Sequence, residues 1–158
     1  MQKQKVQELV ELITQKLVER GDIEAVIWCG SSYFLPEGEN YNPHDIDIIV
    51  ITDASEDLPS WLWGIEEVRK KVQEVGLTVD ITQRRLGWLR GIVNPLILAL
   101  FTKGHKVMYA NEKVKKTLVW VKKAWNKVKD RVKFIQWGIR GKDLNKHYDL
   151  PVWKELRI

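Results

Sequence analysis

The sequence contains one cysteine, Cys29, and three histidines that lie far apart in the chain. A single cysteine cannot form an intrachain disulfide, and no histidine has a Cys or His partner at zinc-ligand spacing. Long apolar runs are missing too, because the longest stretch, residues 92–101, is interrupted by Asn94 and Pro95 and is too short to span a bilayer. These absences argue against a disulfide scaffold, a zinc-binding domain and contact with a membrane, and Cys29 is expected to be a small buried residue.

Low-complexity segments and internal repeats are also absent. The N-terminal residues are charged and have a helical pattern, unlike a signal peptide, so we expect a cytoplasmic protein. A chain of 158 residues can bury one ordinary core. We therefore expect one domain over residues 1–110, and a basic amphipathic helix with a C-terminal tail over residues 111–158, packed on that domain or on a partner.

Charge is distributed unevenly along the chain, which has a net charge of +5. Residues 1–80 contain 7 Lys and Arg against 16 Asp and Glu, whereas residues 81–158 contain 19 against 5. Such asymmetry favours metal ions on an acidic face and polyanions on a basic face. The charge pattern does not identify the polyanion.

Apolar periodicity predicts alternating strands and helices. The expected strands are residues 23–29, 45–52, 77–82 and 105–109. The expected helices are residues 3–20, 31–35, 61–75, 86–93, 95–103 and 111–137. This order favours an α/β or α+β sandwich with the sheet on one side and the helices on the other. Residues 36–43 are rich in turn-forming residues and are expected to form a mobile flap.

Two carboxylates share one side of the strand expected at residues 45–52. Side chains alternate along a strand, so Asp45 and Asp47 point one way and the apolar residues between and after them point the other. Two such close carboxylates repel each other unless a cation lies between them. A third acid, Asp80, lies in the β-prone run at residues 77–82. The three acids predict a divalent-metal site, and solvated acids at strand ends are the alternative.

A Gly-Ser step follows the first expected strand at Gly30-Ser31. Glycine permits close backbone approach, and a serine with exposed N–H groups at a helix start can hold phosphate oxygens. We therefore predict phosphate contacts at Gly30, Ser31 and Ser32, with a plain turn as the alternative.

In this order, Gly30-Ser31, Asp45-Ile46-Asp47 and Asp80 resemble the motifs of the nucleotidyltransferases of the DNA polymerase beta superfamily, especially the minimal nucleotidyltransferase group. The resemblance covers residues 23 to 110 of the chain. It implies an α/β (α+β) fold with a mixed β-sheet of about four strands flanked by helices. The periodicity of residues 111–137 adds a long C-terminal helix. Residues 1–110 would be the catalytic domain.

The same resemblance implies an enzyme that moves an NMP from an NTP to an acceptor hydroxyl and releases pyrophosphate. Asp45, Asp47 and Asp80 would be the catalytic residues and the ligands of Mg²⁺ or Mn²⁺. Gly30, Ser31 and Ser32 would bind the nucleotide, for which ATP is the expected NTP.

The expected helix at residues 111–137 has two different faces. Apolar residues repeat at alternating four- and three-residue steps from Val114 to Ile135, and nine Lys or Arg accompany two acids. The 114–135 stripe is expected to cover the protein's own sheet, to form a homodimer or to bind a helical partner.

The resemblance adds a partner of known kind, because small members of the group commonly act in pairs with a helical HEPN-type toxin. The alternative functions are therefore a catalytically weak partner-binding module, such as the antitoxin of a toxin–antitoxin pair, and a nucleic-acid-binding protein. In the second case the basic face of the helix would hold the nucleic acid; otherwise it is a solvated surface.

Overall fold

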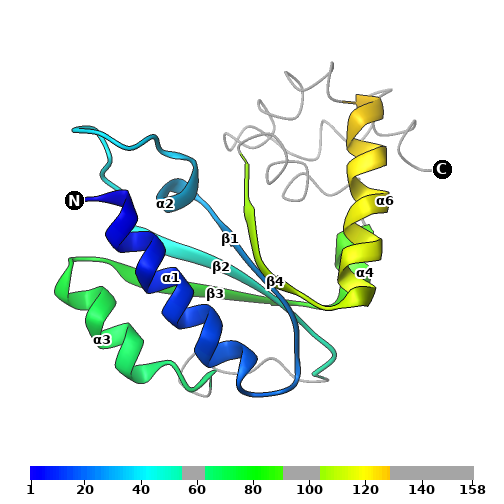
Figure 1. The fold of residues 1–158 in the computed structure, drawn as a ribbon, viewed down its shortest axis with the longest axis horizontal. Helices are drawn as coiled ribbons and strands as arrows, with labels where there is room; N and C mark the ends of the chain where they lie inside the picture. Colours follow the sequence, from blue (N-terminus) through cyan, green and yellow to red (C-terminus); the bar gives the residue numbers. More distant parts are fainter. Residues whose placement is uncertain (55–62, 91–103, 129–158) are drawn as a thin grey trace, which may run out of the picture.

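The computed structural model describes residues 1–54, 63–90 and 104–128. In this part of the chain four strands form one mixed sheet in the order β3-β2-β1-β4 (Figure 1). The strands are β1 (Ile23–Cys29), β2 (Asp45–Thr52), β3 (Thr78–Arg84) and β4 (Lys106–Ala110). β1 is antiparallel to β2 and β4, whereas β2 is parallel to β3. The expected α/β fold with a mixed, helix-flanked sheet is confirmed.

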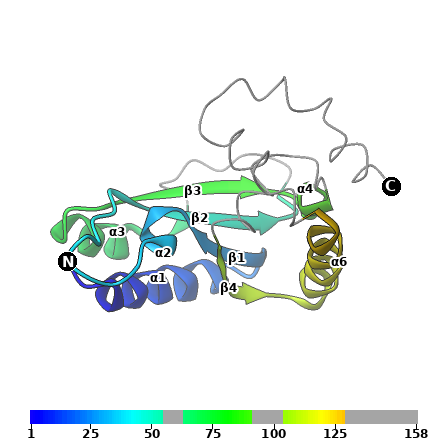
Figure 2. The ribbon, with the colours of Figure 1, turned by 90° about the horizontal axis from the view of Figure 1, so that it is seen from above.

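One face of the sheet is covered by α1 (Lys3–Val18) and α3 (Glu66–Glu74), which contact each other (Figures 1 and 2). α3 lies in the crossover that the parallel β2–β3 pair requires. The apolar stripe of α1 is buried at every position: Val6, Leu9, Val10, Ile13 and Leu17. These side chains pack on the even-numbered residues of β1 and β2, such as Trp28 and Ile48, and form the larger core cluster.

The opposite face of the sheet is covered by α4 (Leu86–Arg90) and α6 (Glu112–Val128) (Figure 2). Leu89, Val114 and Val121 pack there on odd-numbered residues of β1 and β2, such as Ile27 and Ile49. The expectation that all helices lie on one side of the sheet is therefore wrong. The reason is that every residue of β1 is buried, and a central strand with two apolar faces needs cover on both.

α6 packs on the protein's own sheet through the first part of the 114–135 stripe. Val114 and Val121 are 0% exposed, and Leu118 packs against the same cluster. Asn111 caps the N-terminus of α6, because its side-chain oxygen accepts a hydrogen bond of 3.0 Å from the Val114 amide. These apolar side chains are thus unavailable to a second copy or a helical partner. For them, the expectation that the stripe covers the protein's own sheet is confirmed.

Several expected features lie outside the described residues: the helix at 95–103, the stripe beyond α6 and the C-terminal tail. The boundary between residues 110 and 111 stays a prediction. Among the helices that are described, none combines the length and the apolar character needed to cross a bilayer.

Candidate functional site

The register of the sheet brings the three predicted acids to one face. Asp47 lies directly across from Asp80 in the parallel β2–β3 pair, and Asp45 lies across from Thr78. Residues opposite each other in register, and residues two apart on one strand, point to the same face. Asp45, Asp47 and Asp80 therefore share the α4–α6 face of the sheet, at the end where β2 begins.

The carboxylate of Asp47 is the electrostatic centre of this group. Its pKa is raised to about 6, first by burial, then by the charges of Asp45 and Asp80 and by a side-chain hydrogen bond with Asp45. Each of these influences disfavours the ionised form. The strand end thus holds negative charge that a bound cation would stabilise.

Gly30 touches this carboxylate. A Cβ atom on Gly30 would lie 1.9 Å from the Asp47 Oδ2 atom and 2.7 Å from its Cγ atom. The backbone of Gly30 has φ 73° and ψ −171°, a region that essentially only glycine adopts. Steric contact and backbone conformation both require glycine here, and together they put the Gly-Ser turn directly beside the acids.

The turn continues into α2 (Ser31–Phe34), one turn of helix. The amides of Tyr33 and Phe34 donate to the Gly30 carbonyl, whereas the first amides of a helix have no acceptor within it. Ser31 is half-buried and follows the contact with Asp47 directly. Ser31 therefore lies next to the acids and is partly accessible to solvent.

Ser32 has a different environment from Ser31. It is 0% exposed, and its hydroxyl accepts a buried hydrogen bond of 2.8 Å from the Trp28 indole N–H. Its carbonyl accepts a hydrogen bond of 2.7 Å from the Tyr41 hydroxyl. The side chain of Ser32 therefore stabilises the turn, and the phosphate contacts expected at Gly30, Ser31 and Ser32 stay a prediction.

Cys29 completes the row of side chains across the sheet, because it pairs with Asp47 in the β1–β2 register. It is 7% exposed, and its Sγ atom donates to the Asp47 carbonyl at 3.7 Å. Burial, followed by the charges of Asp47 and Asp80, raises the pKa of the thiol to about 12. As expected, Cys29 is a buried small residue, and its thiol stays protonated.

The loop at residues 36–43 is anchored, unlike the free flap that its composition suggested. Tyr41 is 2% exposed and packs in the larger core cluster. The Lys3 ammonium group of α1 donates hydrogen bonds to the carbonyls of Tyr33 and Leu35, just before the loop. Sequence analysis missed Lys3 and Tyr41, because a lone Lys in an amphipathic helix and a lone Tyr in a polar loop carry no distinguishing pattern.

Metal binding by the three acids stays a prediction. Within residues 1–54, 63–90 and 104–128, no group of three or more His, Cys, Asp and Glu side chains is placed to hold a metal ion. Asp45, Asp47 and Asp80 share a face and interact electrostatically, but their carboxylates as oriented do not converge on one point. To bind one ion together, these side chains would have to rotate. The side chain of Asp80 has room to rotate, because it is exposed.

Comparison with known proteins finds similarity in solved structures only. No protein-family model matches the chain, and no curated protein matches it significantly. One similar structure is a toxin–antitoxin with AMP-PNP, at 16% identity and a TM-score of 0.42, covering 83% of this chain and 98% of that chain.

Two further structures are similar to the same extent. The toxin–antitoxin MntA-HepT is 14% identical with a TM-score of 0.41, covering 85% of this chain and 99% of that chain. A tri-AMPylated Shewanella oneidensis HEPN toxin in complex with MNT antitoxin is 15% identical with a TM-score of 0.42, covering 85% of this chain and 98% of that chain. Similarity at this level does not establish a function for this chain.

Proposed function

We propose that this protein is a divalent-metal-dependent nucleotidyltransferase, which moves an NMP from an NTP to an acceptor hydroxyl with release of pyrophosphate. The support is one contact: the Gly30-Ser31 turn lies against the Asp47 carboxylate, on the face that Asp45 and Asp80 share. A phosphate-binding turn beside clustered acids is the combination that metal-assisted phosphoryl chemistry requires, because the cation must contact both protein carboxylates and substrate phosphates.

The donor set fits a hard cation. Asp45, Asp47 and Asp80 offer only carboxylate oxygens, which suit Mg²⁺ or Mn²⁺. The repulsion that raises the pKa of Asp47 would be relieved by a divalent charge. Bound there, the ion would neutralise the NTP phosphates and lower the pKa of the acceptor hydroxyl.

The remaining task of the protein is to hold the nucleotide in place. The amide and hydroxyl of Ser31 would donate hydrogen bonds to phosphate oxygens, and the missing side chain of Gly30 lets the phosphates approach the backbone. The buried hydrogen bonds from Trp28 and Tyr41 to Ser32 keep this turn rigid. A fixed turn reduces the entropy lost on binding.

Binding of ATP with Mg²⁺, measured by isothermal titration calorimetry, tests the site directly. Asp47→Asn should weaken Mg²⁺-ATP binding at least about tenfold, because it removes a ligand charge from the centre of the acidic group. Glu67→Gln is the matched control, since Glu67 is an exposed acid in the first turn of α3. Equal affinity of wild type and Asp47→Asn would rule out the proposed metal site.

Transfer itself is measured with radiolabelled ATP. Label at the α-phosphorus should appear on an acceptor, whereas label at the γ-phosphorus should appear only in pyrophosphate, because the bond to the α-phosphorus is the one exchanged. Incubation with cell extract would show whether the labelled acceptor is a protein, an RNA or a small molecule. Transfer of the γ-label would contradict the proposed reaction and indicate a kinase.

A further inference from the structure

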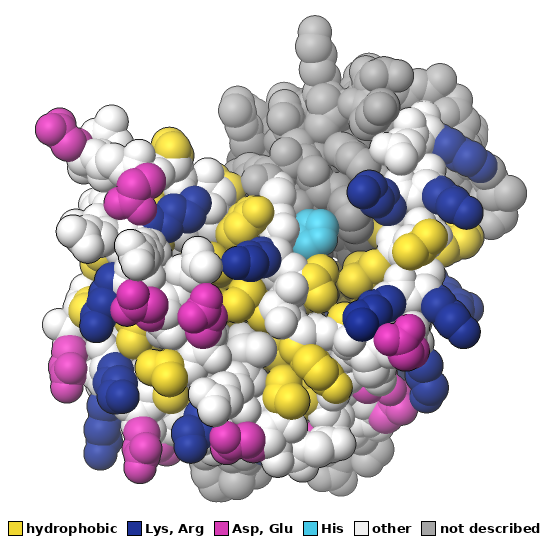
Figure 3. All heavy atoms as spheres, in the orientation of Figure 1, with side chains coloured by type: hydrophobic (Ala, Val, Ile, Leu, Met, Phe, Trp, Pro, Cys, Tyr) yellow, Lys and Arg dark blue, Asp and Glu magenta, His cyan; other side chains and the backbone are white. Residues whose placement is uncertain are grey.

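α6 carries a cationic stripe next to its buried apolar stripe. Five exposed residues recur at alternating three- and four-residue steps and form what we call the basic stripe: Lys113, Lys116, Trp120, Lys123 and Lys127. Residues spaced in this way lie on one face of a helix. At 1.5 Å per residue the stripe is about 21 Å long. Figure 3 shows Lys and Arg gathered over α6, whereas acids and bases are mixed over α1 and α3.

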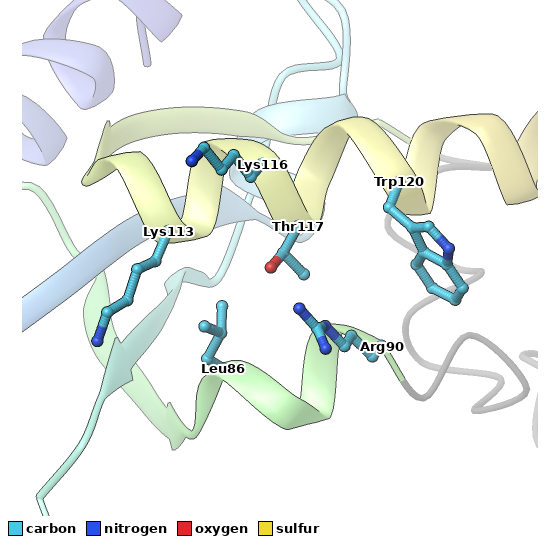
Figure 4. Close-up of a pocket in the computed structure, with 6 residues that line it drawn as sticks. All are labelled: Leu86, Arg90, Lys113, Lys116, Thr117 and Trp120. Atoms are coloured by element: carbon cyan, nitrogen blue, oxygen red, sulfur yellow. The ribbon is translucent and has the colours of Figure 1, made fainter.

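A groove runs beside the stripe, between α4 and α6. It has a volume of about 640 Å³ and is lined by six residues: Leu86, Arg90, Lys113, Lys116, Thr117 and Trp120. Figure 4 shows Arg90 reaching from α4 towards Thr117, while the ring of Trp120 projects from α6 on the same side. The groove thus combines cations from two helices with an aromatic ring.

The positive charge of this surface is largely uncompensated. α6 contains six Lys and one acid, Glu112, which pairs with Lys115 at 3.2 Å. Lys113 lies 3.9 Å from Glu24, but Arg90 and Lys116 form no ion pair with any carboxylate of the described residues. Like charges three and four residues apart destabilise a helix. A bound polyanion would relieve this repulsion.

The exposed side chain of Trp120 indicates which kind of polyanion binds here. Its side chain is 45% exposed, although the apolar stripe on the same helix is buried. An exposed indole between cations is a stacking platform for an unpaired base, with the neighbouring Lys residues on the phosphates. Bases in a duplex are already stacked on each other and cannot reach such a ring. An acidic protein segment would use the charges but not the ring.

We infer that the basic stripe and the α4–α6 groove bind single-stranded nucleic acid. Lys116, Lys123 and Arg90 contact phosphates, and one base stacks on Trp120. This site uses none of the acids of β2 and β3, so the inference does not depend on the proposed transferase activity.

Fluorescence anisotropy of the full chain with a labelled single-stranded RNA of about 12 nucleotides tests the phosphate contacts. Replacing Lys116 and Lys123 with Ala should weaken binding and reduce the slope of log K against log salt by about 1.4, from two lost contacts. The matched control is Lys70→Ala with Lys71→Ala, two exposed lysines on α3, on the other face of the sheet. This control should leave affinity and slope unchanged.

The same assay tests the stacked base. Trp120→Ala should weaken binding about 5- to 150-fold with the salt slope unchanged, because it removes a stacking contact and no charge. Trp120→Phe should retain most of the affinity, because its ring can still stack. Trp120→Leu keeps an apolar side chain without an aromatic ring, so it should lose affinity as Trp120→Ala does, and it replaces that variant if the Ala variant fails to fold. Val119→Ala is the control, since Val119 is the adjacent apolar residue and is 57% exposed.

Two results would overturn the inference. One is wild-type affinity in Trp120→Ala, or in Trp120→Leu if the Ala variant fails to fold, with circular dichroism showing that the variant is folded. The other is equal binding of heparin and of the RNA, because heparin has sulfates but no bases to stack. Either result would show a general polyanion surface in place of a nucleic-acid site.

Discussion

Gly30 meets two constraints at one position, the contact with Asp47 and a backbone conformation with φ 73°. Gly30→Ala should lower the free energy of unfolding by about 1–3 kcal/mol from backbone strain, and further because the new methyl group displaces the Asp47 carboxylate. Urea denaturation measures the effect. Gly21→Ala is the control, since Gly21 has φ +83° but no atom within 4 Å of the added Cβ. Equal losses in the two variants would contradict the close packing at Gly30.

Asp47 makes stability depend on pH. Its pKa is about 6 when folded and 3.8 when unperturbed, so the folded state holds the proton more tightly. Stability should therefore fall as pH rises from about 4 to about 6, by about 1 kcal/mol after discounting for solvent screening. Thermal melts in metal-free buffer should show this slope in wild type and less of it in Asp47→Asn. An identical slope in the two proteins would contradict the raised pKa of Asp47.

The Cys29 thiol is expected to be inert. Its pKa of about 12 and its burial leave almost no accessible thiolate at pH 8. A thiol reagent such as Ellman's reagent should report less than one reactive thiol per chain in the native protein and one after denaturation. Rapid labelling of the native protein would mean that the end of β1 opens readily.

At the scale of the element, α6 presents two valines, two residues apart, in opposite environments. Val121 is 0% exposed on the sheet, and Val119 is 57% exposed. Val121→Ala should cost about 1–3 kcal/mol of unfolding free energy, because it removes two buried methyl groups and leaves a cavity, whereas Val119→Ala should cost little. Chemical denaturation of the two variants is the measurement. Equal costs would mean that α6 does not pack on the sheet in solution.

For the secondary-structure elements, sequence patterns were reliable where the pattern is local. The expected bounds of β1 and β2 agree with the structure, and α1 begins where the helix at residues 3–20 was expected to begin and ends two residues earlier. The apolar stripe of α6 indicated that this helix packs on another apolar surface. It did not identify that surface, because the same residues can pack on the protein's own sheet or on another chain. The loop at 36–43 was misjudged because its anchor, Tyr41, is buried in the core cluster formed with distant residues, which the local composition does not indicate.

At the scale of the whole molecule, the basic half of the chain is joined to the acidic half through one sheet. α6 and β4 pack on β1 and bring residues 106–128 against residues 23–29. We therefore expect α6 to unfold together with the sheet in one transition. Far-ultraviolet circular dichroism and tryptophan fluorescence should give the same midpoint in urea. An earlier loss of helix signal would support a separate unit beginning at residue 111.

The sequence by itself determined the strands, the helix faces and the side to which Asp45 and Asp47 point, because these depend on alternation and helical periodicity between near neighbours. Only the tertiary structure decided that Asp80 lies opposite Asp47, that Gly30 touches that carboxylate, that Ser32 is hidden and that helices cover both faces. Strand order, register and burial depend on contacts between distant residues. No short window of sequence contains that information.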